Sequence, residues 1–183
     1  MLTEGQAAPA FTVQDIEHQE ISLESLRGSY SLVSFFRYAG CPFCSLSLIK
    51  LIERYGNFAE RGLKVVSFFQ SPDASISKYV SLNKPPFPIV GDADKTVYDA
   101  YQIQRSVAGA VRSIADVPEV LMASAAGTVK QGTIDGDFFL MPAQFIIGPD
   151  LKIMKAHYGN SFRDTISLLD IEEVLLTKVA PTV

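Results

Sequence analysis

The fold is decided by residues 30–44, which read YSLVSFFRYAGCPFC. The aromatic and aliphatic run Tyr30–Arg37 predicts a buried strand, and a second compact apolar run, Leu63–Phe69, predicts another. Between them, apolar residues recur near helical spacing up to a stop at Gly62, namely Leu46, Ile49, Ile52, Phe58 and Ala59. A strand, a helix and a parallel strand make up a βαβ unit.

The two cysteines of the chain, Cys41 and Cys44, lie where the first strand turns into this helix. Pro42 is favoured at the first helical position because its missing N–H would be unpaired there, so Cys41 is predicted to cap the helix. Residues three apart on a helix have Cα atoms about 5–5.5 Å apart, within the range that a disulfide requires. We therefore predict that oxidation joins the two cysteines within one chain.

The helix assigns different roles to the two sulfurs. Free N–H groups and the helix dipole favour negative charge at Cys41, which should lower its pKa from about 8.5 into the range of roughly 3.5–7.5. Cys44, inside the first turn, gains less and is expected to be more covered. These positions predict that Cys41 attacks and that Cys44 resolves.

Two other interpretations of the cysteines stay open. Free cysteines often serve as small buried hydrophobic residues. A zinc site would need both cysteines together with His18 and His157, the two histidines of the chain, and the paired spacing of such sites is missing. The three-residue spacing, the proline and the position after a strand favour redox chemistry. We expect neither a metal nor a cofactor.

The ends of the chain predict short extended elements. Phe11–Val13 and Ile21–Leu23 are expected to be extended, and a helical turn, Leu23–Arg27, is expected to close at Gly28. Gln144–Ile147 and Ile153–Tyr158, separated by Gly148-Pro149-Asp150, predict a hairpin.

The remaining helices are less regular. Val117–Gly136 shows no pattern that assigns it, and Asp170, with Glu173 three residues later, marks the expected start of a last helix that runs to about Lys178. Further helices are predicted at Asp73–Leu82, Thr96–Tyr101 and Ala108–Ala115.

Composition narrows the function classes. The chain has 183 residues and 20.0 kDa, which predicts one domain spanning residues 1–183. Its 48% hydrophobic and 20% charged residues exclude disorder, and its longest uncharged runs, 12 residues each, are too short to span a bilayer. A net charge of −4 without a basic run argues against nucleic acid, and no signal peptide is visible. We expect a cytoplasmic protein without a membrane or nucleic-acid partner.

Several stretches resemble a known family over about residues 5–178. They are Ala8-Pro9-Ala10-Phe11, the Cys41-Pro42-Phe43-Cys44 motif, Phe87-Pro88-Ile89-Val90 with Asp92–Tyr101, and Met141–Ile147. Together they resemble the thioredoxin-like superfamily and, within it, the redoxin or AhpC/TSA (peroxiredoxin-like) branch. The resemblance implies an α/β fold, a central mixed β-sheet flanked by helices, with an N-terminal extension and an insertion before the cis-proline loop.

The resemblance also implies a substrate-contacting loop at Met141 and Pro142. In the family the loop proline is cis and packs against the cysteines, while the residue before it offers backbone groups to an extended substrate. Pro142 itself supports a turn, because it breaks an apolar run just before a predicted strand. An ordinary proline at the start of a strand is the alternative.

The chain departs from the family at several positions. Tyr38 and Ser34 stand where peroxiredoxins carry threonine or serine and proline, and Pro142 stands where their active-site arginine falls. Phe35 and Gly40 replace the buried acid and the tryptophan of thioredoxin. Arg37 could replace part of the missing arginine, although a lone arginine at a strand end is more often a solvated charge.

The expected function is thiol–disulfide exchange, with Cys41 attacking a substrate disulfide and Cys44 releasing the product. The alternative is a thiol-dependent peroxidase that reduces hydrogen peroxide or alkyl hydroperoxides, in which Cys41 becomes a sulfenic acid that condenses with Cys44. A redox-inert interaction module on the same fold is the third hypothesis. The resemblance implies a disulfide or peroxide substrate and an electron donor from the thioredoxin, glutaredoxin or glutathione system, and it leaves a homodimer open.

Overall fold

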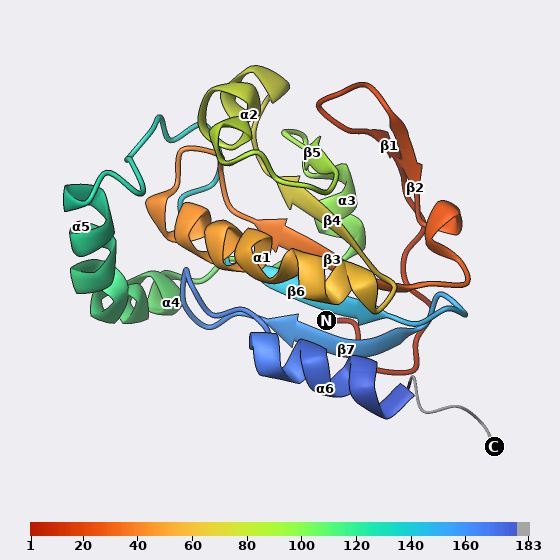
Figure 1. Ribbon diagram of the computed structural model, residues 1–183. Coiled ribbons are helices and arrows are strands. Elements are labelled where there is room, and N and C mark those ends of the chain that lie inside the picture. Colours follow the sequence, from red (N-terminus) through yellow and green to blue (C-terminus); the bar gives the residue numbers. More distant parts are fainter. Residues whose placement is uncertain (179–183) are drawn as a thin grey trace.

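The fold is built on a five-stranded sheet with the strand order β5-β4-β3-β6-β7 (Figure 1). The structure is a computed structural model that describes residues 1–178. The strands are β3 (Tyr30–Phe36), β4 (Leu63–Phe69), β5 (Ile89–Gly91), β6 (Ala143–Ile147) and β7 (Ile153–Tyr158). β3, β4 and β5 are mutually parallel, whereas β6 is antiparallel to β3 and to β7. The predicted mixed sheet is confirmed.

The register between β3 and β4 sends paired aromatic rings to opposite faces of the sheet. Phe35 pairs with Phe68 and stacks on it at 5.0 Å between ring centroids, while the next pair, Phe36 and Phe69, stacks at 5.1 Å. Because successive side chains on a strand point to opposite faces, each pair anchors a separate core. The carboxyl end of β3 is therefore held from both sides just before residue 37.

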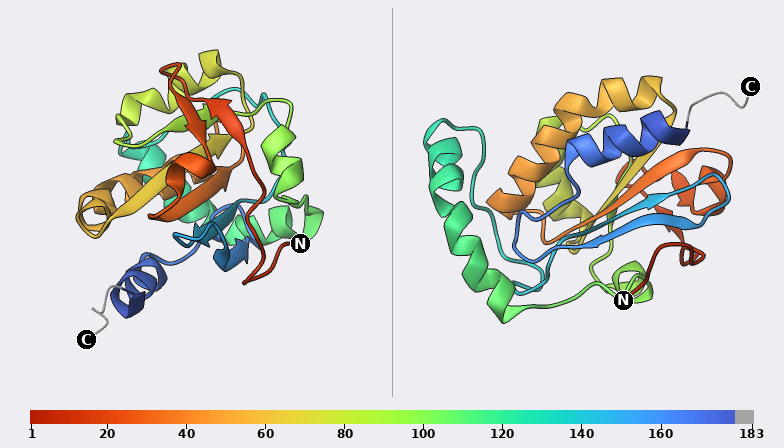
Figure 2. Two further views of the ribbon diagram at one scale, coloured as in Figure 1. Left: turned by 90° about the vertical axis from the view of Figure 1, so that its right-hand side faces the viewer. Right: turned by 90° about the horizontal axis from the view of Figure 1, so that it is seen from below.

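Helices cover both faces of the sheet (Figure 2). One core lies under α1 (Pro42–Glu60), α2 (Asp73–Tyr79) and α6 (Leu168–Lys178), and it contains Cys41, Cys44 and Phe36. The other lies under α3 (Thr96–Ala100) and the N-terminal segment, and it contains Phe35. α1 connects the parallel strands β3 and β4, which confirms the predicted βαβ unit.

The N-terminal extension forms a separate two-stranded hairpin. β1 (Thr12–Gln14) pairs with β2 (Glu20–Ser22) in antiparallel fashion. A 3-10 turn, η1 (Glu24–Leu26), follows, and Gly28 then takes a positive φ of 81° that side chains other than glycine rarely adopt. The predicted extended pieces and the helical turn are thus present.

Several predicted boundaries differ in the structure. The last helix begins at Leu168 rather than Asp170, because the hydroxyl of Ser167 accepts the backbone N–H of Asp170 at 3.0 Å and caps the first turn. The predicted helix over Asp73–Leu82 is divided into α2 and a 3-10 turn, η2 (Ser81–Asn83). The predicted helix over Ala108–Ala115 is α4 (Val107–Arg112) followed by η3 (Ser113–Asp116). β5, with three residues, is a strand that the sequence pattern did not predict.

The stretch Val117–Gly136, which showed no sequence pattern, contains a helix followed by an extended segment without regular secondary structure. α5 (Val117–Ala125) packs on the first turns of α1 through Val120 and Leu46, and Val129, which follows α5, joins this cluster. Residues 126–140, here called the strap, then run from α5 past the start of α1 toward α2 before entering β6 (Figure 1). Within residues 1–178, no helix is long and apolar enough to cross a membrane.

Candidate active site

Cys41 occupies the N-cap of α1, directly after the turn that follows β3. Pro42 is the first helical residue, and the Cys41 backbone is extended, with φ −81° and ψ 115°. The sulfur accepts the backbone N–H of Cys44 at 3.4 Å, and the Cys41 carbonyl accepts the backbone N–H of Ser45 at 3.0 Å. The predicted capping geometry is confirmed, so the free N–H groups of the first turn point at this sulfur.

The two thiols are both free and both buried, with exposed fractions of 0% for Cys41 and 1% for Cys44. The expectation that Cys44 would be more covered than Cys41 is therefore wrong. Its cause lies outside the βαβ unit, because the strap and the loop after β7 close over this end of α1. The intramolecular disulfide stays a prediction.

The pKa values of the two thiols move in opposite directions. Burial raises the pKa of Cys41, but hydrogen bonding from Cys44, the positive charge of Arg37 and the backbone N–H groups of Cys44 and Phe43 outweigh it and lower this pKa to about 7. Burial and the bond to the Cys41 sulfur raise the pKa of Cys44 well above its usual range. At neutral pH about half of the Cys41 sulfur is thus thiolate, whereas the Cys44 sulfur holds a proton.

Arg37 follows the last residue of β3, and its guanidinium lies against the reactive sulfur. Nη1 donates to the Cys41 sulfur at 3.2 Å, and Nη2 donates to the Phe138 carbonyl of the strap. The guanidinium carbon lies 3.3 Å from the ring centroid of Phe162 and 5.1 Å from that of Phe138. Arg37 is 1% exposed, so the expectation of a solvated charge is wrong.

The charge on Arg37 has no carboxylate partner in the described part of the chain. None of the ion pairs there includes it, and its buried Nε lacks a hydrogen-bond partner. A buried cation without a counter-charge is costly. The Cys41 thiolate, at hydrogen-bond distance, is the negative charge that offsets it, so each group stabilises the charged form of the other.

The strap is fastened to the site at two glycines. The Gly132 N–H donates to the Gly40 carbonyl at 2.8 Å, and a Cβ atom added to Gly40 would lie 2.6 Å from the Thr133 carbonyl oxygen. A Cβ atom on Gly132 would lie 2.8 Å from the Gly40 Cα. This approach requires both residues to lack side chains. Tyr79 adds a side-chain contact, since its hydroxyl lies 3.2 Å from that of Thr133.

Met141 and Pro142 lie elsewhere than the resemblance implied. No peptide bond among the described residues is cis, so the predicted cis bond before Pro142 is wrong. The chain enters β6 in an extended trans form, and the Pro142 carbonyl accepts the Gly159 N–H at 2.8 Å, which continues the β6–β7 pairing. The Met141 N–H donates to the Gln104 carbonyl at 2.9 Å and is not free for an extended substrate.

Sequence reasoning missed three residues that complete the site, namely Phe138, Phe162 and Gly132. The guanidinium of Arg37 lies over the ring of Phe162 and beside that of Phe138, and these two rings meet edge to face with their centroids 5.5 Å apart. They come from two loops that are distant in sequence from Cys41. The closely spaced glycines of the strap were the available signal, since they indicate a close backbone approach.

The thioredoxin-like fold and the cysteine pair at a helix N-terminus agree with three comparisons. Residues 4–156 match the AhpC/TSA family. The chain therefore belongs to the AhpC/TSA family. Over 125 residues it is 29% identical to a protein of Mycobacterium tuberculosis that is named as a peroxiredoxin, covering 64% of this chain and 80% of the relative. Over 101 residues it is 29% identical to the thiol-disulfide oxidoreductase ResA of Halalkalibacterium halodurans, covering 55% of this chain and 57% of that protein.

Two solved structures show the same fold at lower sequence identity. Peroxidoxin BcpB from Mycobacterium tuberculosis superimposes with a TM-score of 0.67 at 16% identity, over 97% of this chain and 96% of that one. The thiol:disulfide interchange protein DsbE from Chlorobium tepidum gives 0.65 at 16% identity, over 97% of each chain. The fold is thus shared by relatives named for both kinds of thiol chemistry.

Proposed function

We propose that the protein is a thiol–disulfide oxidoreductase in which Cys41 is the attacking residue. The observation that carries this proposal is the pair of opposite pKa shifts at adjacent sulfurs, about 7 for Cys41 and well above the usual range for Cys44. Attack on a disulfide requires a thiolate, and the second sulfur must stay protonated until the first is bound. The relatives named for thiol–disulfide chemistry support the same reading.

The reaction has two exchange steps. The Cys41 thiolate attacks one sulfur of the substrate disulfide, and the other sulfur leaves as a thiolate that takes up a proton. Cys44 then loses its proton and attacks the Cys41 sulfur, so that the Cys41–Cys44 bond forms and the second substrate sulfur leaves. The substrate gains two electrons, and the enzyme becomes a disulfide.

Arg37 is proposed to act in both steps through its charge. Before reaction it favours the Cys41 thiolate, which its Nη1 contacts at 3.2 Å. During resolution the negative charge moves to the leaving substrate sulfur, next to the same guanidinium. Donors that are already in place cost no reorganisation when the charge develops. Met141 and Pro142 are not proposed to contact the substrate, because both are buried and the Met141 N–H is bonded internally.

Peroxide reduction is the second candidate, and one observation favours it. Cys41 is 0% exposed, so a small hydroperoxide reaches it with less rearrangement than a protein disulfide requires. In that reaction the thiolate attacks one peroxide oxygen, the O–O bond breaks, and the other oxygen leaves as an alkoxide or hydroxide that takes up a proton. The resulting sulfenic acid condenses with the Cys44 thiol to form a disulfide and water. Arg37 would then stabilise the leaving oxygen.

The proposal extends to partners and compartment. A thiol donor, from a thioredoxin, glutaredoxin or glutathione system, would return the disulfide to the dithiol. The cytoplasm suits this cycle because its thiols are kept reduced. A homodimer is compatible with the exposed apolar side chains of α5, Leu121 and Met122.

Parallel steady-state assays with insulin disulfide and hydrogen peroxide test the proposal. Cys41→Ser should lower insulin reduction by more than about a thousandfold, since it removes the attacking thiolate. Cys44→Ser is the matched control, because it should retain the first attack and accumulate one mixed disulfide on Cys41 that mass spectrometry detects. Insulin reduction that survives in Cys41→Ser would contradict the proposal. Peroxide turnover that far exceeds insulin reduction would favour the second candidate.

A further inference from the structure

A pocket of about 400 Å³ lies beside the start of α1, between α2, η2 and the strap. Its volume falls within the range of about 300–1,000 Å³ that is typical of small-molecule sites. The lining combines apolar contact from Leu82 and Val129 with the polar side chains of Asn83 and Gln131. Such a mixture suits a small, flexible and strongly polar molecule.

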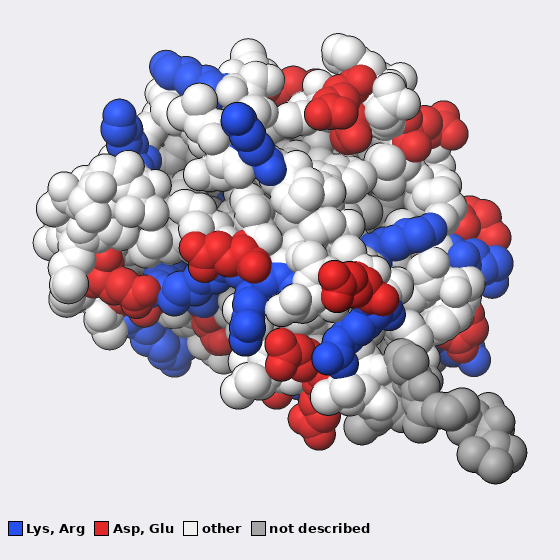
Figure 3. Space-filling view, viewed as in Figure 1, with Lys and Arg blue, Asp and Glu red and all other residues white. Residues whose placement is uncertain are grey.

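The charge around this pocket is positive. Its ten lining residues include Lys78 and Lys130 but no aspartate or glutamate. Neither lysine takes part in an ion pair within the described part of the chain. On the surface over α2 and its side toward α5, Lys and Arg side chains stand without Asp or Glu between them (Figure 3). An anionic group entering the pocket would thus meet two cations that have no carboxylate partner among the described residues.

Two residues that line the pocket form hydrogen bonds to the backbone at Cys41 and at the residue before it. Ser45 lines the pocket, and its hydroxyl donates to the Cys41 carbonyl at 3.1 Å. Gln131 also lines the pocket, and its Nε2 lies 3.4 Å from the carbonyl oxygen of Gly40. The next strap residue, Gly132, forms the single backbone hydrogen bond that holds the strap on Gly40. A ligand in the pocket would therefore contact the part of the strap that closes over the site.

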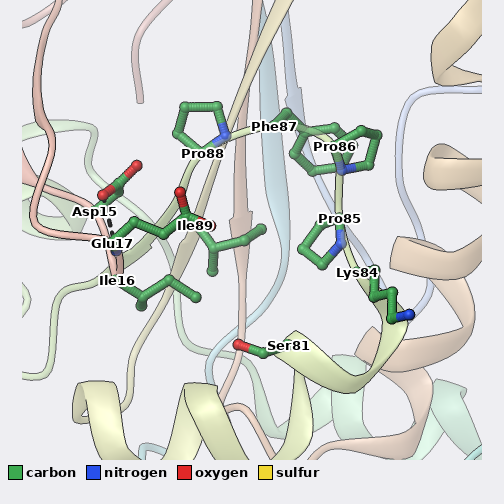
Figure 4. Close-up of a pocket in the computed structure, with 10 residues that line it drawn as sticks. All are labelled: Asp15, Ile16, Glu17, Ser81, Lys84, Pro85, Pro86, Phe87, Pro88 and Ile89. Atoms are coloured by element: carbon green, nitrogen blue, oxygen red, sulfur yellow. Dashed lines mark hydrogen bonds between the residues drawn. The ribbon is translucent and has the colours of Figure 1, made fainter.

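A second cavity offers a contrasting environment. It has a volume of about 510 Å³ and lies between the β1–β2 turn and the proline-rich segment before β5 (Figure 4). Asp15 and Glu17 stand on one wall, opposite Lys84 and the prolines. It includes no residue of the site around Cys41, and its carboxylates would repel an anion. Of these two cavities, the one beside Cys41 is the one that suits an anion.

We propose that the pocket at Lys78 and Lys130 binds the carboxylate groups of a low-molecular-weight thiol, which serves as the reductant of the Cys41–Cys44 disulfide. The proposal rests on the thiol chemistry of Cys41 proposed above. A small thiol also suits a sulfur that is 0% exposed, since it needs a smaller opening of the strap than a protein disulfide does.

The electrons balance over two molecules of the thiol. The thiolate of the first attacks the Cys41 sulfur, the Cys41–Cys44 bond breaks, and Cys44 leaves and takes up a proton. A second thiolate attacks the sulfur of the bound thiol, which releases the small disulfide and the Cys41 thiolate. Two thiols are oxidised to one disulfide, and the enzyme is reduced to the dithiol.

The test compares a charged and an uncharged thiol on the oxidised full-length protein. Reduced glutathione, which carries two carboxylates, and 2-mercaptoethanol, which carries none, are the probes, and acid-quenched mass spectrometry counts the free thiols over time. The test variant is the double substitution Lys78→Gln and Lys130→Gln. The matched control is the double substitution Lys64→Gln and Lys152→Gln, which removes the same amount of charge. These lysines lie at the amino-terminal end of β3, away from the pocket, where Lys64 of β4 pairs with Ser31 of β3.

We expect the Lys78→Gln/Lys130→Gln variant to lower the second-order rate constant for glutathione about fivefold at low ionic strength and to leave that for 2-mercaptoethanol unchanged. The control pair should change neither. Unreactive S-methylglutathione should shift the amide resonances of Lys130 and Gln131 in the wild type. An equal change in the rate constants for both thiols, or no change in either, would overturn the proposal that this pocket binds the reductant. Insulin reduction that persists in Cys41→Ser would instead overturn the proposed function.

Discussion

The β3–α1–β4 unit and the strap hold the same site by different means. In the unit, backbone pairing runs without interruption from Tyr30 with Leu63 to Phe36 with Phe69, and the aromatic rings are buried on both faces. The strap reaches the site through one backbone hydrogen bond at Gly132, a few side-chain bonds and the partly exposed ring of Phe138. The unit thus sets where the sulfur lies, and the strap sets whether the sulfur can be reached.

This difference separates stability from access. Regions with few buried apolar contacts open at low free-energy cost, whereas core strands open only with global unfolding. Substitutions in the unit should therefore change the free energy of unfolding. Substitutions in the strap should change the reactivity of Cys41 while the protein stays folded.

The largest effect is expected in the unit, for Phe35→Ala. Phe35 is 0% exposed, and its ring lies 4.9–5.9 Å from those of Phe68, Tyr98, Tyr101 and Phe145. Loss of such a ring costs about 3–5 kcal/mol of unfolding free energy. Phe138→Ala in the strap is the matched substitution and should cost less than about 1 kcal/mol, because the ring is 42% exposed. Urea unfolding of the reduced proteins measures both, and similar losses would show that the strap belongs to the core.

The second-largest effect is expected for Arg37→Met, because Arg37 contacts both the Cys41 sulfur and the strap. Arg37→Met removes the positive charge that lowers the pKa of Cys41 and leaves the burial that raises it. We expect this pKa to rise from about 7 to at least the ordinary value of about 8.5. Since the thiolate is the reactive form, the rise of rate with pH should move upward, and the rate at about pH 7 should fall about fifteenfold.

Ultraviolet absorbance of the thiolate, titrated from about pH 5 to 9 against the oxidised protein, measures this pKa without requiring access to the sulfur. Arg54→Met is the control, because Arg54 lies farther along α1 and pairs with Glu172 at 3.7 Å. An unchanged Cys41 pKa in Arg37→Met would contradict the proposal that the charge of Arg37 lowers this pKa, and it would show that Arg37 acts only through packing.

The smallest effect is expected for Tyr79→Phe, which removes the hydroxyl that Thr133 of the strap contacts through its own hydroxyl and its N–H. The strap should open more often, and iodoacetamide should label Cys41 about two- to fivefold faster with no change in its pKa. Tyr55→Phe is the control, since Tyr55 packs against Phe87 away from the strap. Equal labelling rates in all three proteins would indicate that the strap does not limit access.

The sequence predicted the unit well because its signals are local. Apolar runs of strand length, a helical repeat ending at Gly62 and a proline at the first helical position each act within a few residues. Together they placed Cys41 at the N-cap of α1, where the structure has it. The same holds for the β6–β7 hairpin, whose turn residues are adjacent in the chain.

The strap and the burial of Arg37 could not be predicted, since they depend on contacts between distant residues. Arg37 and Phe138 are 101 residues apart in the chain, and they meet through a hydrogen bond to a backbone carbonyl and a contact between the guanidinium and the aromatic ring. The isomer of the bond before Pro142 was also mispredicted. Tertiary context selects the isomer of an X–Pro bond, and here the pairing of Pro142 with Gly159 holds the extended form.

The opposite pKa shifts of the two thiols also determine how many protons accompany the electrons. Above the Cys41 pKa of about 7 the reduced pair holds one proton, on Cys44, so that oxidation releases two electrons and one proton. A two-electron couple that exchanges one proton changes its reduction potential by about 30 mV per pH unit, half the change of a couple that exchanges two. Between about pH 7 and the ordinary thiol pKa of about 8.5, the reduction potential of this buried pair is thus less sensitive to pH than that of an ordinary dithiol.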